Sequence, residues 1–420
     1  MNKLVINGPV KLSGEVRIPG AKNTVLPILA ATVISGKKSE IYDCPKIRDV
    51  ELTIDILKDL GCLVYWEENK LVVDSSTMNK TVIKEELMDK MRSSIILTGA
   101  ILARFKKVKT TYPGGCELGL RPIDLHIKAF RQMGILVKEK SGFIELDAGC
   151  IRETDIHLDF PSVGATENIM LASSTLKGKT RIINAAKEPE IEDLQNFLVK
   201  IGVKVSGAGT SIIEIEGTDN FYDAGHKVIP DRIVASTYMV AAAITGGDVV
   251  LRNVDFNHLG SFISVMSAMG CEITKKDKDV LRIKGKENLK NVNMIRTSPY
   301  PGFPTDAQSV MMTLMSVSNG TGMIIENIFD GRFRHAEELK KMGADITVSG
   351  RCAVVKGVKG FCGARVNAPD LRSGAGLVVA GLCAEGITEV SNVHYIERGY
   401  ENIAMDLRNL GAEITYTGSF

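Results

Sequence analysis

The chain has 420 residues and a formal net charge of +2, with 44% hydrophobic and 24% charged residues. This length provides for two or three domains, and so small a net charge gives no bulk field that would attract nucleic acid or an anionic lipid surface. No apolar run reaches the roughly 18 residues that a membrane helix needs, and no leader opens the sequence. We therefore expect a cytoplasmic protein with no nucleic-acid partner and no membrane partner.

The cysteines and histidines are scattered along the chain. The eight cysteines include no CxxC pair, and the six histidines form no HxxxH pattern and no His/Cys cluster. Large proteins kept in a reducing compartment have such cysteines, and metal sites need ligands at closer spacing. The sequence therefore predicts no metal site and no cofactor.

A sixfold repeat organises the chain. Amphipathic segments end in an apolar residue before glycine, and a β-branched run follows, at Gly61, Gly134, Gly202, Gly270, Gly343 and Gly411. Successive glycines lie 73, 68, 68, 73 and 68 residues apart. Each copy predicts a helix, a glycine C-cap and a strand.

A second helix precedes each of these glycines by about 38 residues and is rich in small residues. These segments are residues 23–36, 92–105, 165–178, 232–247, 306–320 and 373–386. They are apolar on nearly all sides, which predicts burial, and their alanines, glycines and serines allow close packing. Six buried and six amphipathic helices imply two globules of three units each, divided near residues 217–232.

Cations stand at the predicted helix starts. Arg48, Arg121 and Arg398 lie 13 residues before their glycines and are predicted to open the amphipathic helices, and Arg332 lies 11 before Gly343. The buried helices are predicted to begin near Lys22, Arg92, Arg232, Asp306 and Arg372. Because a helix N-terminus itself attracts anions, the set predicts a site for a phosphate and a carboxylate. A local carboxylate partner for each cation is the alternative.

Residues 110–122, TTYPGGCELGLRP, predict a shaped loop. Pro113 fixes its own φ, Gly114 and Gly115 permit close approaches, and Pro122 suits the first turn of a helix. Cys116 is therefore expected on an exposed loop and not in a core.

Seven segments together resemble the enolpyruvyl transferase family, and within it the members that act on UDP-N-acetylglucosamine. They are residues 20–28, 113–126, 161–170, 300–308, 331–339, 370–381 and 397–402. The resemblance implies an α/β (α+β) fold of two inside-out α/β barrel domains, each built from three βαβαββ-type units as in EPSP synthase. It also implies a first domain of residues 21–228 that carries the Cys116 loop, a second domain of residues 1–20 and 229–420, and an active site in the cleft between them.

The resemblance implies transfer of the enolpyruvyl group of phosphoenolpyruvate to the 3-hydroxyl of UDP-N-acetylglucosamine, with release of phosphate by addition and elimination. This is the first committed step of peptidoglycan synthesis. Cys116 is the implied proton donor and the target of alkylation by fosfomycin. Asp306 is the implied base, and its alternative role is an ordinary helix N-cap.

The resemblance also implies the residues that bind substrate. Lys22, Arg121 and Arg398 match ligands of phosphoenolpyruvate or phosphate, Arg332 and Arg372 match carboxylate partners, and Asn23 can hydrogen-bond the reacting centre. The implied catalytic residues are Cys116, Asp306, Lys22, Asn23 and Arg398. The uridine nucleotide is assigned to Arg92, Arg121, Pro122, Ile123, Asp124, Leu125, Ser162, Val163 and Gly164, with Ile328 near the sugar.

Two alternatives remain open. The first is 5-enolpyruvylshikimate-3-phosphate synthase, which shares the fold and phosphoenolpyruvate; Cys116 and residues 162–170 favour the sugar nucleotide. The second is a duplicate that binds ligand and regulates without turnover, against which the presence of Lys22, Cys116, Asp306 and Arg398 argues.

Overall fold

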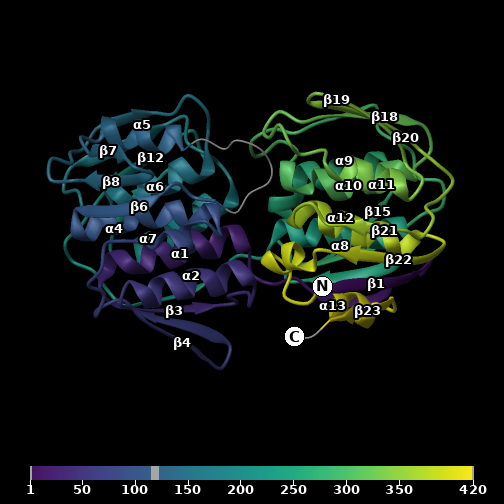
Figure 1. Cartoon of the computed structure of the whole chain (residues 1–420), viewed down its shortest axis with the longest axis horizontal. Helices are drawn as coiled ribbons and strands as arrows, with labels where there is room; N and C mark the ends of the chain where they lie inside the picture. Colours follow the sequence, from purple (N-terminus) through teal and green to yellow (C-terminus); the bar gives the residue numbers. More distant parts are fainter. Residues whose placement is uncertain (1, 115–122, 419–420) are drawn as a thin grey trace. The chain divides into compact units, whose positions relative to one another are not determined.

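The computed structural model describes residues 2–114 and 123–418, so the predicted site residues Cys116, Arg121 and Pro122 lie outside the described residues. The chain forms two compact units (Figure 1). We call residues 20–229 the first unit, and residues up to 19 together with those from 230 onward the second unit. The sequence placed this boundary between residues 228 and 229.

One repeat of the first unit shows the plan of the fold, from which one other repeat departs by having a three-stranded sheet among the described residues. It consists of β9 (Asp155–His157), α6 (Val163–Ser173), β10 (Lys179–Ile183), α7 (Pro189–Lys200), β11 (Lys204–Ser206) and β12 (Ile212–Glu216). β9 runs parallel to β10, and β12 pairs antiparallel with both β10 and β11. This order is a βαβαββ unit, as the resemblance to the enolpyruvyl transferase family implies.

Two more sheets complete the strands described for the first unit. Their strand orders are β13 (Ala224–Lys227), β3 (Lys38–Tyr42), β5 (Lys70–Asp74), β4 (Leu63–Glu67), and β6 (Lys107–Thr111), β8 (Phe143–Asp147), β7 (Leu136–Lys140). The other helices are α1 (Lys22–Ser35), α2 (Arg48–Asp59), α3 (Glu85–Met88), η1 (Arg92–Ile96), α4 (Leu97–Phe105) and α5 (Asp124–Gln132).

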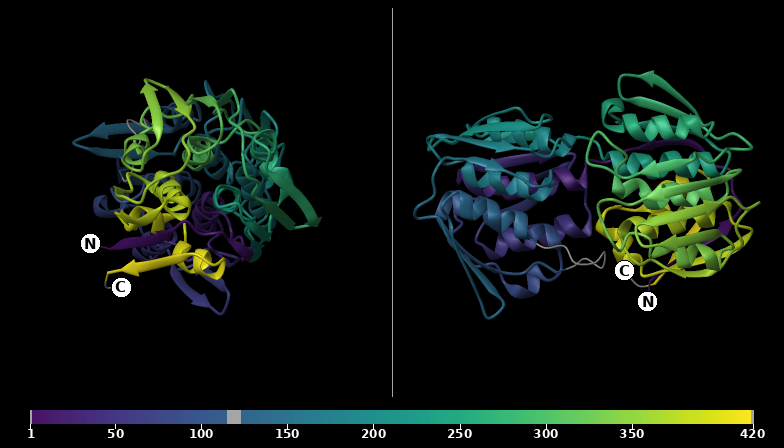
Figure 2. Two further views of the ribbon diagram at one scale, coloured as in Figure 1. Left: turned by 90° about the vertical axis from the view of Figure 1, so that its right-hand side faces the viewer. Right: turned by 90° about the horizontal axis from the view of Figure 1, so that it is seen from above.

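The second unit repeats the plan with both chain ends in one sheet. That sheet has the order β21 (Arg365–Asn367), β22 (Gly386–Ser391), β1 (Lys3–Gly8), β23 (Glu413–Thr417). β1 pairs antiparallel with β22 on one side and with β23 on the other, so the two ends lie side by side (Figure 2).

Its other two sheets have the orders β15 (Glu272–Asp277), β16 (Val280–Lys284), β14 (Asp248–Arg252), β2 (Ser13–Arg17), and β17 (Met294–Arg296), β18 (Thr321–Ile325), β20 (Cys352–Lys356), β19 (Asp345–Ser349). The helices are α8 (Arg232–Ile244), η2 (Phe256–Leu259), α9 (Gly260–Ala268), η3 (Thr305–Ala307), α10 (Gln308–Ser316), α11 (His335–Lys341), α12 (Leu371–Cys383), η4 (Val393–Arg398) and α13 (Ile403–Asn409).

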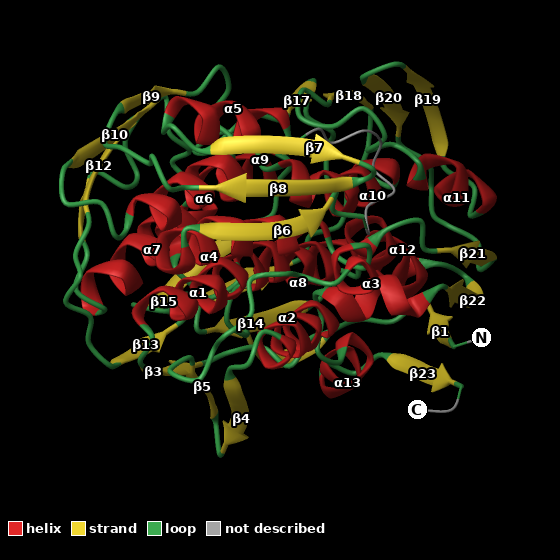
Figure 3. Cartoon of the chain, turned by 60° about the vertical axis from the view of Figure 1, so that its left-hand side comes forward, coloured by secondary structure: helices red, strands yellow, loops and turns green. Residues whose placement is uncertain are grey.

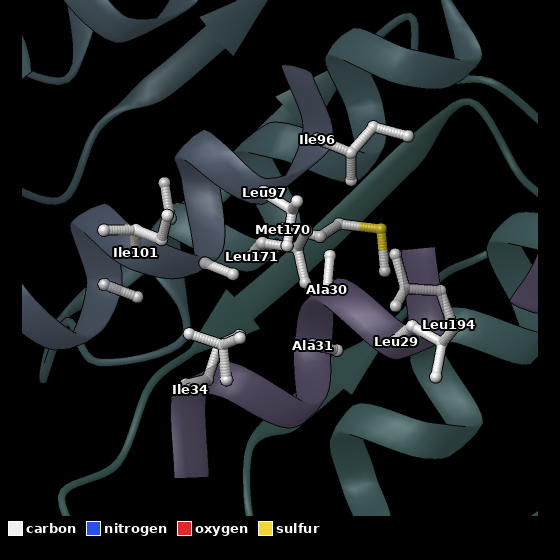
Figure 4. Close-up of a cluster of buried hydrophobic side chains, with 14 of the residues drawn as sticks. Leu29, Ala30, Ala31, Ile34, Ile96, Leu97, Ile101, Met170, Leu171 and Leu194 are labelled. Atoms are coloured by element: carbon white, nitrogen blue, oxygen red, sulfur yellow. The ribbon is translucent and has the colours of Figure 1, made fainter. Parts of the chain in front are cut away.

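The small-residue helices form the interior of each unit, and the sheets lie around them (Figure 3). Every residue of α1 except Asn23 is buried. Figure 4 shows side chains of α1, α4 and α6, among them Ala30, Leu97 and Met170, gathered in the core of the first unit. A Cβ added at Gly99 of α4 would lie 2.5 Å from the carbonyl oxygen of Asn168 on α6, so glycine is required for this approach.

The six repeat glycines have the backbone conformation that a glycine C-cap requires. Their φ angles lie between 83° and 112°, a region that L side chains rarely adopt. At Gly343 and Gly411 an added Cβ would meet no atom within 4 Å, so the positive φ alone explains the glycine there.

Two predicted helix starts are wrong. The helix predicted to open at Arg121 begins at Asp124, with Ile123 in its N-cap position. Arg398 does not open an amphipathic helix: it ends η4, and α13 begins at Ile403. The reason is Asn402, whose side chain accepts a hydrogen bond from the backbone N of Met405 and so caps the helix at that point. Within the described part of the chain, no helix has the length and the apolar character needed to cross a membrane.

Candidate active site

The structure divides the described site residues between the two units. The first unit holds Lys22, Asn23, Arg92, Ile123, Asp124, Leu125, Ser162, Val163 and Gly164. The second unit holds Asp306, Ile328, Arg332, Arg372 and Arg398. Each group is described within its own unit.

Asp306 is held by two arginines. It lies in η3, the short turn before α10, with its side chain 26% exposed. Nη2 of Arg332 donates to Oδ1 of Asp306 at 2.8 Å, and Nη2 of Arg372 donates to Oδ2 at 3.1 Å. The predicted base and the two predicted carboxylate partners therefore form one cluster, with charge-assisted hydrogen bonds on both carboxylate oxygens.

Both guanidinium groups are buried, Arg332 with 1% and Arg372 with 4% of its surface exposed. Arg332 lies in the turn before α11, and its Nε and Nη2 also donate to the carbonyl oxygen of Thr305 at 3.2 and 3.1 Å. Burial is the largest influence on Arg372 and opposes its charge, but Asp306, Tyr400 and Asp231 together outweigh burial and raise the pKa of Arg372. These arginines are fixed cations and not mobile surface groups.

Arg372 lies in the first turn of α12, where Asp370 caps the helix. Oδ1 of Asp370 accepts hydrogen bonds from the backbone N of Arg372 at 2.9 Å and of Ser373 at 3.0 Å. The cap satisfies backbone donors at this terminus and places one negative charge beside the arginine. In the "DLRS" segment the capping Asp370 stands two residues before Arg372, and this spacing places the backbone of Arg372 in the first turn of α12.

Arg398 lies beside the beginning of α12. η4 packs against this helix so closely that a Cβ at Gly374 would lie 2.7 Å from the side chain of Ile396. A Cβ at Gly399 would lie 2.8 Å from the side chain of Leu371. The glycines of the "RSGAG" and "ERGY" segments thus explain how Arg398 comes to the same end of α12 as Arg372.

Ile328 is connected to the Asp306 cluster through Glu326, a residue that sequence reasoning missed. Glu326 follows β18 directly and is fully buried. Its Oε1 accepts a hydrogen bond from the backbone N of Ile328 at 2.8 Å, and its Oε2 accepts one from the hydroxyl of Thr305 at 3.0 Å. A single glutamate after a strand carries no pattern in the sequence, so only the fold reveals it.

In the first unit, Lys22 begins α1 and is paired with Asp49. Its Nζ lies 2.7 Å from Oδ2 of Asp49 in the first turn of α2, and both side chains are buried. The preceding Gly20 is required by its position, because an added Cβ would lie 2.0 Å from the carbonyl oxygen of Asp43. The "PGAKN" segment is thus explained by a close backbone approach that delivers Lys22 to Asp49.

The residues assigned to the uridine nucleotide converge on His126 of α5. A Cβ at Gly164, in the first turn of α6, would lie 3.2 Å from Cε1 of this imidazole. The charge of Arg92 is close enough to His126 to lower its pKa. Ser162 caps α6 by accepting a hydrogen bond from the backbone N of Ala165. The structure therefore brings Arg92, the start of α5 and the start of α6 together.

His126 is held in one orientation and one tautomer by Asn168. Oδ1 of Asn168 accepts from the backbone N of Gly99 at 2.9 Å, which fixes the amide, and Nδ2 donates to the carbonyl oxygen of Ile95 at 3.0 Å. Nδ2 also donates to Nδ1 of His126 at 2.8 Å, so the ring hydrogen lies on Nε2. Burial, with the charge of Arg92, lowers the pKa of His126 to about 3.

Some of the cations that were predicted to bind an external anion are paired with carboxylates of the chain. Lys22 has Asp49, and Arg332 and Arg372 share Asp306. The cations also differ in burial, since Arg332 is buried whereas Arg48 is exposed. An anion that binds either group of residues must therefore compete with, or rearrange, the ion pairs of that group.

The described cysteines are all free. Burial raises the pKa of the Cys62 and Cys383 thiols to about 12 and that of Cys271 to about 11. Cys150 and Cys362 are exposed. In the described part of the chain, no group of three or more histidines, cysteines or carboxylates is arranged to hold a metal ion.

Comparison with known families matches nearly the whole chain. The family model described as EPSP synthase (3-phosphoshikimate 1-carboxyvinyltransferase) matches residues 6–407. The "UDP-N-acetylglucosamine 1-carboxyvinyltransferase 2" of Caldanaerobacter subterraneus subsp. tengcongensis is 48% identical over 99% of this chain and 99% of its own length. The "UDP-N-acetylglucosamine 1-carboxyvinyltransferase" of Halothermothrix orenii is 45% identical over the same shares.

Solved structures share the fold at lower identity. The enolpyruvyl transferase NikO from Streptomyces tendae has a TM-score of 0.89 at 22% identity and covers 100% of this chain and 99% of its own. The EPSP synthase from Acinetobacter baumannii has a TM-score of 0.76 at 18% identity and covers 100% of both chains. The α/β fold class predicted from the sequence is confirmed.

The neutral burial of His126 predicts a pH-dependent stability of the first unit. The unfolded histidine binds a proton below its ordinary pKa of 6.5, whereas the folded one does not until about pH 3. Stability is therefore present above pH 6.5 and is lost as the pH falls, by about 2 kcal/mol between pH 7 and pH 5 for this one group. Urea unfolding followed by the fluorescence of Trp66, the single tryptophan and part of the first unit, measures this loss.

His126→Gln should reduce the loss of stability on acidification by that amount. His157→Gln replaces an exposed histidine on β9 of the same unit and is the control, with an unchanged pH slope. Equal pH slopes for His126→Gln and the wild type would contradict the assigned neutral state.

Proposed function

The chain belongs to the EPSP synthase family of carboxyvinyl (enolpyruvyl) transferases, and from this premise we propose that it transfers the enolpyruvyl group of phosphoenolpyruvate to the 3-hydroxyl of UDP-N-acetylglucosamine. The observation that carries the choice of acceptor is the match, along almost the entire chain, to relatives named UDP-N-acetylglucosamine 1-carboxyvinyltransferase. The product belongs to the first committed step of peptidoglycan synthesis. The free described cysteines support a reducing, cytoplasmic location.

The reaction is an addition followed by an elimination. A proton is added to the methylene carbon of phosphoenolpyruvate, the sugar oxygen bonds to the adjacent carbon, and the hydroxyl proton passes to a base. The adduct then loses a proton from the new methyl group, the bond between carbon and phosphate oxygen breaks, and the double bond returns as phosphate leaves. The protein must supply an acid, a base and cations for two anionic groups.

Asp306 is the proposed base, and its two arginines are the proposed carboxylate partners. Both carboxylate oxygens of Asp306 now accept hydrogen bonds from Arg332 and Arg372. An incoming carboxylate that takes up one of these guanidinium donors frees an oxygen of Asp306 to accept the hydroxyl proton. Substrate binding would thereby prepare the base, which links the two roles to one rearrangement.

The remaining roles follow the family motif residue by residue. Cys116 is the proposed acid, and Lys22, Arg121 and Arg398 are the proposed phosphate ligands, with Asn23 at the reacting centre. The uridine nucleotide is proposed to bind where Arg92 and the starts of α5 and α6 converge, since a diphosphate suits a cation beside two helix N-termini. Pro122, Ile123, Asp124, Leu125, Ser162, Val163 and Gly164 belong to that proposed subsite.

The acceptor is tested by phosphate release with phosphoenolpyruvate and each of two acceptors. We expect release with UDP-N-acetylglucosamine and none above background with shikimate 3-phosphate. Release only with shikimate 3-phosphate would assign the chain to the other branch of its family. Binding of UDP-N-acetylglucosamine in calorimetry without any release would support a regulatory duplicate instead.

Asp306→Asn should retain binding of UDP-N-acetylglucosamine and lose most of kcat, because an amide cannot accept the proton. A loss of about a hundredfold or more is expected from removal of a general base. Asp345→Asn removes an exposed carboxylate of the same unit, which is paired with Lys356, and should leave kcat unchanged. Turnover of Asp306→Asn within a few-fold of the wild type would remove Asp306 from the mechanism.

Fosfomycin should alkylate Cys116 in preference to the other seven cysteines, and faster when UDP-N-acetylglucosamine is present. Cys62, Cys271 and Cys383 react poorly because burial raises their pKa values, so the exposed Cys150 and Cys362 are the internal controls. Peptide mass mapping measures the labelling. Label spread over the exposed cysteines, or a rate independent of the sugar nucleotide, would count against Cys116 as the acid.

A further inference from the structure

The carboxylate of Glu326 is buried, and both of its oxygens accept hydrogen bonds. None of its surface is exposed, and it accepts four hydrogen bonds. Oε1 accepts from the hydroxyl of Thr297 at 2.9 Å and from the backbone N of Phe329 at 3.1 Å, in addition to the bond from Ile328. A buried carboxylate is costly unless its oxygens are satisfied, and here neutral donors satisfy them.

The two oxygens of this carboxylate serve two different segments. Oε1 holds the turn at Ile328 and Phe329, the segment proposed to lie near the sugar. Oε2 holds the hydroxyl of Thr305, the residue directly before Asp306. One side chain therefore sets the distance between the base segment and the sugar segment.

Thr305 is hydrogen-bonded both through its side chain and through its backbone carbonyl. Its hydroxyl donates to Glu326 at 3.0 Å, and its carbonyl oxygen accepts from Nε and Nη2 of Arg332. The same Nη2 donates to the carboxylate of Asp306. η3 is only three residues long and its N-cap position has no side-chain hydrogen bond, so its own backbone provides little to hold Asp306 in place.

Thr297, the residue directly after β17, contacts the same carboxylate. Its hydroxyl donates to Oε1 of Glu326 and accepts from the backbone N of Asn327 at 2.9 Å. The Asn327 side chain returns a hydrogen bond to the carbonyl oxygen of Thr297 at 3.1 Å. Glu326 thus cannot swing away without breaking a closed set of contacts, which is what a positioning group needs.

We infer that Glu326 is a positioning residue for the proposed reaction, because it holds Asp306 through Thr305 and the sugar segment through the backbone of Ile328 and Phe329. The inference rests on the proposed function. The hydrogen bond between Glu326 and Thr305, which we call the Thr305 arm, affects the proton transfer and hence kcat. The hydrogen bonds between Glu326 and the backbone of Ile328 and Phe329, which we call the Ile328 arm, affect binding of the acceptor and hence its KM.

The Thr305 arm is tested by Thr305→Val, which removes the hydroxyl and keeps the branched shape. We expect kcat to fall about tenfold, since a small displacement of a catalytic group has effects of this order or more, while KM for UDP-N-acetylglucosamine stays within twofold. Thr305→Ser keeps the hydroxyl and should return kcat to near the wild-type value.

Thr313→Val is the matched control. Thr313 is a buried threonine on α10 of the same unit, whose hydroxyl lies 3.2 Å from the carbonyl oxygens of Ser309 and Gly376 and makes no contact with Glu326 or Asp306. It should lower the melting temperature without changing kcat. An equal loss of kcat in both valine variants would show a merely structural effect and overturn the inference.

Glu326→Gln separates the arms further. The amide oxygen can replace Oε1 for its three donors, and the amide NH2 can donate to the hydroxyl of Thr305, which is also an acceptor, so kcat should stay closer to the wild-type value than in Thr305→Val. The double variant should be no slower than Thr305→Val, because that change has already broken the link. Additive losses would overturn the inference.

The outcomes also separate the inference from the function on which it rests. If the wild type releases no phosphate with UDP-N-acetylglucosamine, the proposed function fails and the inference fails with it. If the wild type turns over and Thr305→Val has the same kcat, the inference alone fails.

Discussion

Three small-residue helices pack closely together in each unit, and the described candidate-site residues on these helices stand at their starts. At Gly99 a single methyl group would collide with the backbone of α6. At Gly376 of α12 an added Cβ would lie 3.2 Å from Thr313 of α10. Buried polar residues such as Asn168 and Thr313 also lie within these helices, but Lys22 and Arg372 lie at helix starts, where backbone N–H groups need partners. The positions of Lys22, Arg372 and the proposed nucleotide subsite therefore depend on how these helices pack.

The repeat made the architecture predictable, whereas details of helix starts depended on contacts between segments. Glycines recurring every 68 or 73 residues require a positive φ, a local property that sequence reveals directly. The prediction that Arg398 opens α13 is wrong because the side chain of Asn402 caps this helix, which begins at Ile403. Likewise, the requirement for glycine at Gly20 comes from the Asp43 carbonyl, and no local pattern announces a contact across 23 residues.

The candidate site was predictable only where its residues form motifs. The resemblance gave Asp306, Arg332 and Arg372, and the structure brings these three together. It gave neither His126 nor Glu326, since an isolated histidine or glutamate reads as an ordinary surface residue until tertiary structure buries it. Nor did the pattern of cations reveal that Asp49 and Asp306 already neutralise part of their charge. Each unit thus holds candidate-site cations that are already paired with carboxylates.

The place of β1 between β22 and β23 constrains how the chain is made. On a ribosome, Lys3–Gly8 emerge more than 370 residues before the strands on either side of them, Gly386–Ser391 and Glu413–Thr417. The first unit, by contrast, has its last strand once Lys227 has been synthesised. Synthesis from the N-terminus therefore completes the first unit early. The edges of β1 stay unpaired until nearly the whole chain has been synthesised, so β1 is accessible to chaperones and can mispair with neighbouring nascent chains.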